Sequence, residues 1–125
     1  MRYVPILLLL LSLISSCTRM SVEEQVRTLG TRKFTPEKWA SATTVEREQM
    51  LASFFKQHPT HSLTALQVKK LLGDPTGYYD YDENLAYFVG PPTADSMYGK
   101  ERMLVFITDK CNGGIEEVEL VPSLK

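Results

Sequence analysis

Histidines and carboxylates, the side chains that most often bind metals or transfer protons, are few and poorly spaced in this sequence. The two histidines, His58 and His61, have no third ligand at a spacing typical of a metal site. Asp80, Asp82 and Glu83 lie close together but lack the glycine and the terminal glutamate of a calcium loop. We therefore expect the histidines in a solvated loop, the carboxylates in a hairpin, and no metal site.

No side chain stands in a pattern typical of a catalytic nucleophile. The serines and threonines do not form a nucleophile elbow, and no glycine pattern suits a phosphate. Cys111 lies in the run from Asp109 to Gly114, which is typical of a turn, without a basic group in any recognisable arrangement that would lower the pKa of its thiol. We predict that the chain is not an enzyme and uses no cofactor.

Tyrosines are concentrated in the second half of the chain. Successive residues of a strand point to opposite sides, so Tyr78 and Tyr79 cannot both face the core. Tyrosine is common at protein interfaces because it combines a large rigid apolar body with a polar tip. Cross-strand packing that stabilises the sheet is the alternative. The candidate binding surface consists of Tyr78, Tyr79, Tyr81, Tyr87 and Tyr98.

Cys17 is the residue with the clearest chemical role. Met1 to Tyr3 form a short positive start, and Val4 to Leu13 is an apolar run of about ten residues, half of what a membrane-spanning helix needs. The residues Ile14-Ser15-Ser16-Cys17 resemble the bacterial lipobox, whose cysteine thiol accepts a diacylglycerol. We predict a lipoprotein signal peptide over residues 1–16 and a covalent diacylglycerol and N-acyl chain on Cys17.

The residue after Cys17 bears on the final location. Thr18 stands where lipoproteins retained at the inner membrane usually have Asp. By this resemblance we expect the protein at the periplasmic face of the outer membrane of a Gram-negative-type envelope. Two or three acyl chains on one residue exceed the single chain that holds a protein only marginally. The membrane is thus an expected partner, through a stable lipid anchor.

The rest of the chain has the size and charge of one small domain. The length is 125 residues, which leaves about 109 beyond the leader. All 15 acidic residues lie beyond the leader, whereas one of the 14 basic residues, Arg2, lies within it, so the net charge of the remainder is about −2. That balance offers no positive surface to phosphate backbones, so nucleic acid is not an expected partner.

A polar and charged segment separates Cys17 from the first clear helix start. We expect residues 17–33 to be a lipidated tether that lifts the domain off the membrane, with some helix around Val22 to Leu29. A single α+β domain is expected over residues 34–125.

Capping residues predict where three helices begin. Thr35 precedes Pro36, which suits the first helical position. Thr43 and Thr64 are each followed three residues later by Glu or Gln, the spacing of a capping box. Gly73 is expected to end the last of these helices as a left-handed cap.

After Pro75 the apolar pattern changes to the two-residue period of strands. The alternating segments are Tyr79 to Tyr81, Leu85 to Val89, Met103 to Ile107 and Val118 to Leu120, with hairpin turns expected at Asp82 to Asn84 and Asn112 to Gly114. Helices followed by consecutive hairpins predict an α+β fold in which two or three N-terminal helices pack on one face of a small antiparallel β-sheet.

The segment from Leu63 to Pro75, with Thr64, Gln67 and Gly73 in place, an aromatic strand after it and a last strand pair ending near Val121, resembles the SmpA/OmlA (BamE-type) family of small outer-membrane lipoproteins. The resemblance covers residues 62–121, about half of the chain. It implies two helices against a three-stranded antiparallel sheet, a two-layer arrangement also seen in β-lactamase-inhibitor-type domains. The helices expected before the motif are an extension that the family pattern lacks.

We expect a membrane-anchored, non-enzymatic module for protein interaction or envelope assembly. Its partner would be another envelope protein, bound through the exposed side of the sheet or the loop from Gly90 to Lys100. The alternative is a periplasmic inhibitor or ligand-binding module of the same architecture, whose partner would be a periplasmic enzyme.

Overall fold

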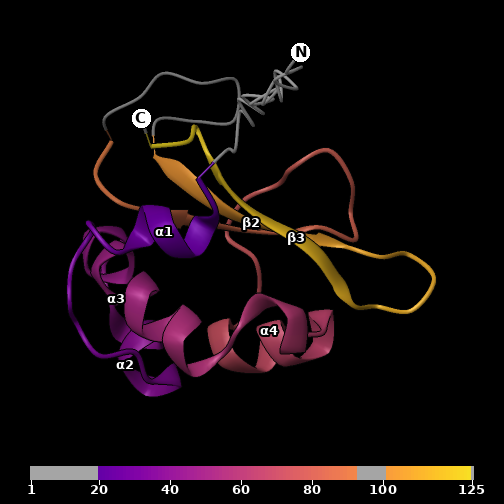
Figure 1. Ribbon diagram of the computed structural model, residues 1–125, viewed down its shortest axis with the longest axis horizontal. Helices are drawn as coiled ribbons and strands as arrows, with labels where there is room; N and C mark the ends of the chain where they lie inside the picture. Colours follow the sequence, from indigo (N-terminus) through magenta and orange to yellow (C-terminus); the bar gives the residue numbers. More distant parts are fainter. Residues whose placement is uncertain (1–19, 93–100, 125) are drawn as a thin grey trace, which may run out of the picture.

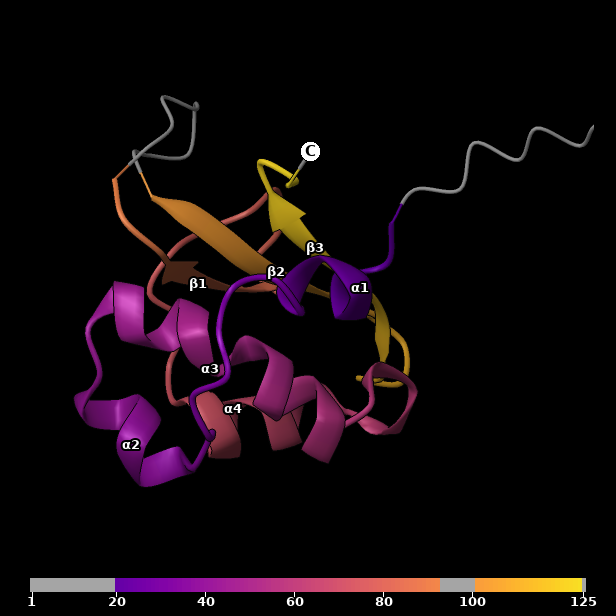
Figure 2. The same ribbon diagram turned by 60° about the vertical axis from the view of Figure 1, so that its left-hand side comes forward.

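Helices and a sheet form two layers in the computed structural model, which describes residues 20–92 and 101–124. Within these residues the helices precede three strands and lie against one face of the sheet (Figures 1 and 2). The predicted α+β fold is therefore confirmed. The elements are α1 (Val22–Val26), α2 (Pro36–Ser41), α3 (Thr44–Gln57), the 3-10 turn η1 (Thr60–Ser62), α4 (Ala65–Leu72), β1 (Leu85–Val89), β2 (Arg102–Thr108) and β3 (Ile115–Val121).

The predicted capping residues begin three of the helices. The Thr35 hydroxyl accepts a hydrogen bond from a first-turn amide of α2. Thr43 with Glu46 and Thr64 with Gln67 form complete capping boxes at the starts of α3 and α4. Each box satisfies two backbone N–H groups that have no partner inside the helix.

Gly73 ends α4 in a conformation that differs from the predicted cap. Its φ of 78° is positive as expected, but its ψ of −165° lies outside the left-handed helical region. Only glycine enters this part of backbone space without strain. A Cβ at this position would meet no atom within 4 Å, so the backbone conformation alone requires glycine here.

The sheet is antiparallel, in the order β1-β2-β3. Tyr87 pairs with Leu104 across β1 and β2, and Phe106 pairs with Val118 across β2 and β3. A bulge in the β2–β3 ladder lies next to the hairpin turn, whose Gly113 has a φ of 73°. Both outer strands, β1 and β3, therefore have one edge that faces away from β2.

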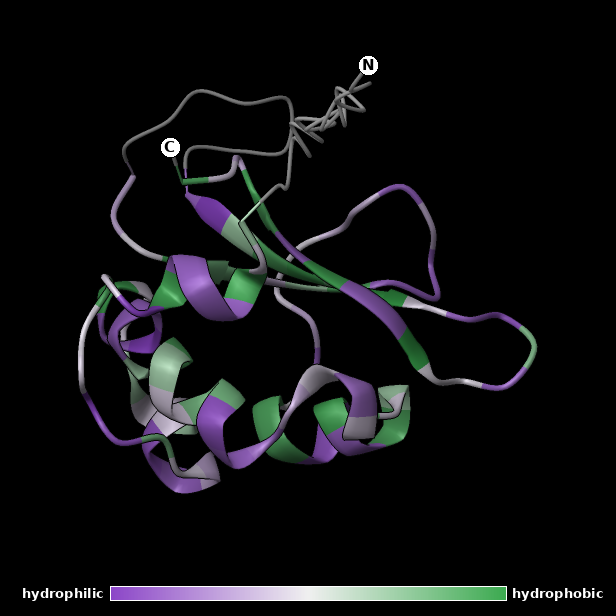
Figure 3. Ribbon diagram, viewed as in Figure 1, coloured by the Kyte–Doolittle hydropathy of each residue, from purple (hydrophilic) through white to green (hydrophobic). Residues whose placement is uncertain are grey.

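The main hydrophobic core lies between the helices and one face of the sheet. From Glu117 to Leu120 of β3, hydrophilic and hydrophobic residues alternate, as the two-residue period of a strand requires (Figure 3). The buried residues come from every helix and every strand: Val22, Val26, Phe34, Trp39, Met50, Leu51, Phe54, Phe55, Leu63, Val68, Leu72, Leu85, Tyr87, Val89, Leu104, Phe106, Val118 and Leu120.

A second, smaller apolar cluster lies on the opposite face of the sheet. Ala86, Met103 and Val105 are fully buried there. The loop before β1 contributes to their cover, because the N–H groups of Thr76 and Gly77 both donate to the carbonyl oxygen of Ala86. The sheet is thus covered by helices on one face and partly by this loop on the other.

The segment expected as a tether is instead part of the folded domain from α1 onward. Ser21 caps α1, and Val22 and Val26, one helical turn apart, are buried in the main core. The Gln25 side chain accepts a hydrogen bond of 3.0 Å from the backbone N–H of Leu124, near the other end of the chain. The short helix forms because its apolar stripe is buried against the end of the sheet.

The strand expected at Tyr79 to Tyr81 is a loop. Asp80 has a φ of 56°, which no β-strand residue adopts, and the N–H of Tyr81 donates to the carbonyl oxygen of Tyr79 over 2.7 Å. Aspartate is one of the few residues that tolerate this region. The segment therefore turns back on itself, and its one bridge to β1 is formed by Gly77 and Ala86.

Candidate functional site

Two of the predicted surface tyrosines are exposed in the loop before β1. Tyr78 and Tyr81 each keep 57% of their surface accessible. Tyr79 lies between them and is partly buried against the apolar cluster on the outer face of the sheet. The prediction that Tyr78 and Tyr79 do not both face the core is therefore confirmed, although both residues lie in a loop and not in a strand.

Tyr87 does not belong to the candidate surface. Its side chain is fully buried, and its ring centroid lies 6.3 Å from that of Trp39 and 6.1 Å from that of Phe106. Burial, with Asp74 as a lesser cause, raises the pKa of its phenol far above the usual value. The strand period places Tyr87 on the helix-facing side of β1, so the expectation that it could be a surface residue is wrong.

Hydrogen bonds hold the tyrosine loop in one conformation. The Asn84 amide donates to the carbonyl oxygen of Tyr79 over 3.1 Å, and its side-chain oxygen accepts from the backbone N–H of Thr108 over 3.2 Å. The Tyr78 hydroxyl donates to the carbonyl oxygen of Asp80 over 2.8 Å. Because the buried Asn84 side chain binds both Tyr79 and Thr108, the loop is attached to β2, and less conformational entropy is lost when a ligand binds.

A groove of about 530 Å³ lies between this loop, the β2–β3 hairpin and β3. We call it the tyrosine groove. Tyr79 and Tyr81 line one side, and Glu117 and Glu119 of β3 line the other. The Lys110 ammonium from the hairpin lies 4.2 Å from the centroid of the Tyr81 ring. This cation–π contact shows that the aromatic face in the groove accepts a positive group.

The carboxylates make the tyrosine groove negative. Burial raises the pKa of the Tyr79 phenol, and the nearby charges of Glu119, Asp80 and Glu117 raise it further. The phenol therefore stays protonated around neutral pH and keeps its O–H group. Aromatic faces beside carboxylates favour basic side chains, such as lysine or arginine, over acidic ones.

The residues considered for catalysis or metal binding are scattered. His58 caps the end of α3 and its ring lies 5.4 Å from that of Phe54, whereas His61 is exposed on η1. Cys111 is an exposed free thiol in the β2–β3 turn, and its N–H donates to the Asp109 carboxylate. Among residues 20–92 and 101–124, no three His, Cys, Asp or Glu side chains gather in a way that could hold a metal ion.

Cys17 and Tyr98, the predicted lipid attachment site and the fifth candidate tyrosine, lie outside the described residues. So do residues 93–100 of the Gly90 to Lys100 loop.

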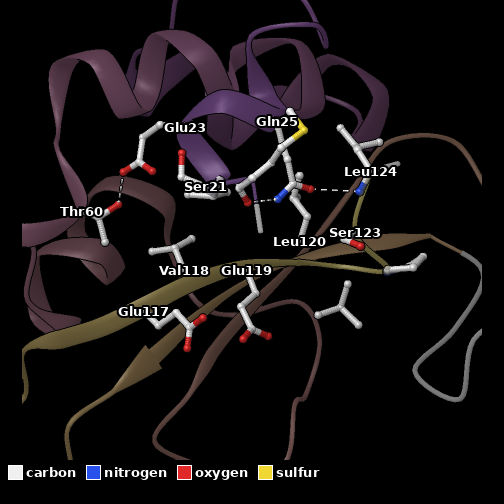
Figure 4. Close-up of a pocket in the computed structure, with 14 residues that line it drawn as sticks. Ser21, Glu23, Gln25, Thr60, Glu117, Val118, Glu119, Leu120, Ser123 and Leu124 are labelled. Atoms are coloured by element: carbon white, nitrogen blue, oxygen red, sulfur yellow. Dashed lines mark hydrogen bonds between the residues drawn. The ribbon is translucent and has the colours of Figure 1, made fainter. Parts of the chain in front are cut away.

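A second groove, of about 700 Å³, separates α1 from β3. We call it the α1–β3 groove. Figure 4 shows Ser21 and Glu23 of the α1 segment on one side and Val118 and Leu120 of β3 on the other. The Glu23 carboxylate accepts a hydrogen bond of 2.7 Å from the Thr60 hydroxyl.

Sequence reasoning missed this groove because its walls come from the two ends of the domain. Glu117 and Glu119 line it together with residues of the α1 segment, and the same two glutamates also line the tyrosine groove. The only available signal was the alternation of glutamate with Val118 and Leu120 in the last strand.

Comparisons with protein-family models, with curated proteins and with solved structures found no match. Of the helices in the described part of the chain, none has the length and apolar character needed to cross a membrane.

Proposed function

We propose that this chain is a lipid-anchored, non-enzymatic protein-binding module of the bacterial outer membrane, with Cys17 as the lipid acceptor. The observation that carries the binding role is the loop beside the tyrosine groove, in which Tyr78 and Tyr81 each remain 57% exposed although the loop is fixed by the buried Asn84. Exposed aromatic side chains held without much freedom are typical of the central residues of protein interfaces.

The leader and lipobox support the location, and the resemblance to the SmpA/OmlA (BamE-type) family supports a role in envelope assembly. Both rest on sequence features, the first on residues 1–17 and the second on residues 62–121. The helices-on-sheet arrangement is compatible with that family. We therefore propose an envelope protein as the partner.

Crosslinking in intact cells tests this function. A photoreactive phenylalanine analogue in place of Tyr81 should capture one envelope protein, because the side chain is exposed at the groove. The same analogue in place of Lys70, which is exposed on α4, is the matched control and should capture none. An outer-membrane component as the captured protein supports the proposal, and a periplasmic enzyme would instead favour an inhibitor.

Stability measurements separate binding from folding. Tyr78→Ser and Tyr81→Ser should change the free energy of unfolding by no more than about 0.5 kcal/mol, as surface substitutions usually do. Each should still abolish or weaken partner capture. If capture is lost only in variants that also unfold, the exposed tyrosines are not the binding surface.

A further inference from the structure

The outer edge of β3 has backbone groups that the sheet does not use. On the opposite edge strand, β1, the N–H of Phe88 donates to the Thr76 hydroxyl. The backbone groups of Phe88 therefore point away from β2 and do not exchange hydrogen bonds with Met103. Hydrogen-bonded and non-bonded pairs alternate in an antiparallel ladder, so Met103 directs its backbone groups toward β3. The same alternation directs the N–H and C=O groups of Val118 and Leu120 outward, away from the sheet.

Other parts of the fold cover only the beginning of this edge. The N–H of Ile115 donates to the carbonyl oxygen of Leu63 over 3.3 Å, and Thr64 bridges to Gly114. Along residues 20–92 and 101–124, no hydrogen bond reaches the outward backbone groups of Val118 or Leu120. These groups are therefore available to one more strand.

The two grooves lie on either side of this edge. Val118 and Leu120 face the helices and line the α1–β3 groove. Glu117 and Glu119 point to the opposite face and line both grooves. A strand added here would send alternate side chains toward α1 and toward the glutamates and the tyrosine groove.

The lining of the grooves determines which strand fits. Toward α1, the added side chains would meet the apolar groups of Val118, Leu120 and Val22. On the other face they would meet the Glu117 carboxylate at the rim of the tyrosine groove, in which the Tyr81 ring already holds the Lys110 ammonium. Apolar residues therefore suit the first set of positions, and lysine or arginine suits the second.

We propose that β3 binds an extended segment of a partner protein as an additional antiparallel strand, and that this segment alternates apolar residues with basic ones. The inference rests on the proposed protein-binding function and specifies the partner's chemistry. Main-chain hydrogen bonds to Val118 and Leu120 would contribute affinity, and the two grooves would select the side chains.

A second copy of this chain is a poor occupant of the same edge. β3 contains Glu116, Glu117 and Glu119 and has no basic residue. Pairing of two β3 edges would bring these carboxylates close together, and like charges across a strand pair are destabilising.

Synthetic peptides test the mode of binding. The probe is a peptide of four Val-Lys repeats, titrated into the full-length chain in detergent micelles while backbone amide NMR signals are followed. The largest shifts are expected at Val118 and Leu120, with the buried Tyr87 amide as the unaffected reference. A peptide of four Val-Glu repeats should bind at least about tenfold more weakly, because each glutamate would face Glu117 or Glu119.

N-methylation of the peptide tests the register. In an antiparallel pair, residues directly opposite each other project to the same face, so the valines opposite Val118 and Leu120 would donate the hydrogen bonds. Methylating the valine nitrogens should weaken binding at least about tenfold, because several hydrogen bonds are lost. Methylating the backbone nitrogens of the lysines, which face solvent, should change the affinity of the peptide less than about twofold. Any other pattern overturns the proposal.

A charge reversal in the protein gives the complementary measurement. Glu117→Lys should weaken binding of the Val-Lys peptide by about fivefold, as loss of an exposed ion pair does. Glu37→Lys, an equal charge change on an exposed residue of α2, is the control and should leave binding unchanged. Equal effects of the two substitutions would show a general charge effect and overturn the proposal.

The outcomes separate this inference from the proposed function. If the peptide fails to bind while the analogue at Tyr81 still captures an envelope protein, the added strand is wrong and the binding function stands. If Val118 and Leu120 amides are already protected from hydrogen exchange in a dimer of this chain, a second copy covers the edge, and the inference is overturned.

Discussion

The Tyr87 hydroxyl donates a hydrogen bond of 2.8 Å to the carbonyl oxygen of Gly73, which joins the middle of β1 to the residue that ends α4. Trp39 reinforces the same junction, because its indole N–H donates to the carbonyl oxygen of Leu72 over 3.1 Å. Two carbonyl groups that α4 cannot satisfy internally are thus satisfied by buried aromatic side chains. The end of the last helix and the sheet are stabilised together.

Removal of the Tyr87 hydroxyl should reduce stability. Tyr87→Phe keeps the ring in the core and loses only the hydrogen bond to Gly73, so the free energy of unfolding should fall by about 0.5–1.5 kcal/mol. Tyr81→Phe, at an exposed ring, is the control and should stay within about 0.5 kcal/mol of the parent. Urea unfolding of both variants measures this, and equal stabilities would show that the Tyr87 bond contributes nothing.

Substitution at Gly73 should cost stability through the backbone alone. Because a Cβ there meets no neighbour, Gly73→Ala and Gly73→Val should both lose about 1–3 kcal/mol, the cost of a strained backbone conformation. Thr64→Ala, at the other end of α4, should lose about 0.5–2 kcal/mol with its cap. Thermal melts of the three variants provide the comparison. An alanine variant at Gly73 as stable as the parent would contradict the observed φ.

The contributions of Glu48 and Glu46, both in α3, to folding stability should change with pH in opposite directions. Burial raises the pKa of Glu48, against the lesser effect of Arg102 at 4.0 Å, whereas the hydrogen bonds with Thr43 lower the pKa of Glu46. The stability linked to Glu48 is therefore present below the unfolded pKa of about 4.3 and lost as the pH rises through the folded value. That linked to Glu46 is present above about 4.3 and lost as the pH falls through the folded value.

Melting temperatures across a pH series check these signs. Relative to the parent, Glu48→Gln should gain stability as the pH rises from about 4 to 7. Glu46→Gln should be less stable than the parent near pH 7, and this difference should shrink as the pH falls to about 4. Parallel pH profiles of the two variants would rule out the opposite linkage.

The lipid attachment can be tested by processing in cells. Cys17→Ser should leave a precursor that keeps its leader, because the peptidase for lipoproteins acts only after the thiol has been acylated. Cys111→Ser, the control, should be processed like the parent since this thiol lies in the exposed turn between β2 and β3. Mobility on gels and incorporation of labelled palmitate measure both. A mature-sized, lipid-labelled Cys17→Ser protein would exclude the proposed anchor.

The parts of the fold that could be predicted depend on residues near one another in the sequence. The caps at Thr35, Thr43 and Thr64 and the β2–β3 turn need only a few neighbouring residues, and all form as expected. In β3 the alternation also reports burial, because Val118 and Leu120 are buried and Glu117 is exposed, whereas in β1 and β2 the residues on both faces are largely buried.

The missed features depend on contacts between distant residues. α1 is stable because the Gln25 side chain binds the backbone of Leu124 and because Val22 and Val26 are buried in the core. The polar local sequence reveals neither contact. Tyr79 and Tyr81 alternate like strand residues, but Asn84 holds them in a loop by bonding to β2. The α1–β3 groove could not be predicted for the same reason, since its two walls join only after folding.

The position of α1 limits how far the folded domain can travel from its proposed anchor. Val22 is already part of the core, and it follows Cys17 by five residues, a stretch that spans at most about 18 Å when fully extended. A lipid on Cys17 would thus be joined to the folded domain by a short tether, which keeps Val22 within about 18 Å of the acylated residue. Partners held in the same membrane would therefore meet the domain at high effective concentration, because both are confined to one surface.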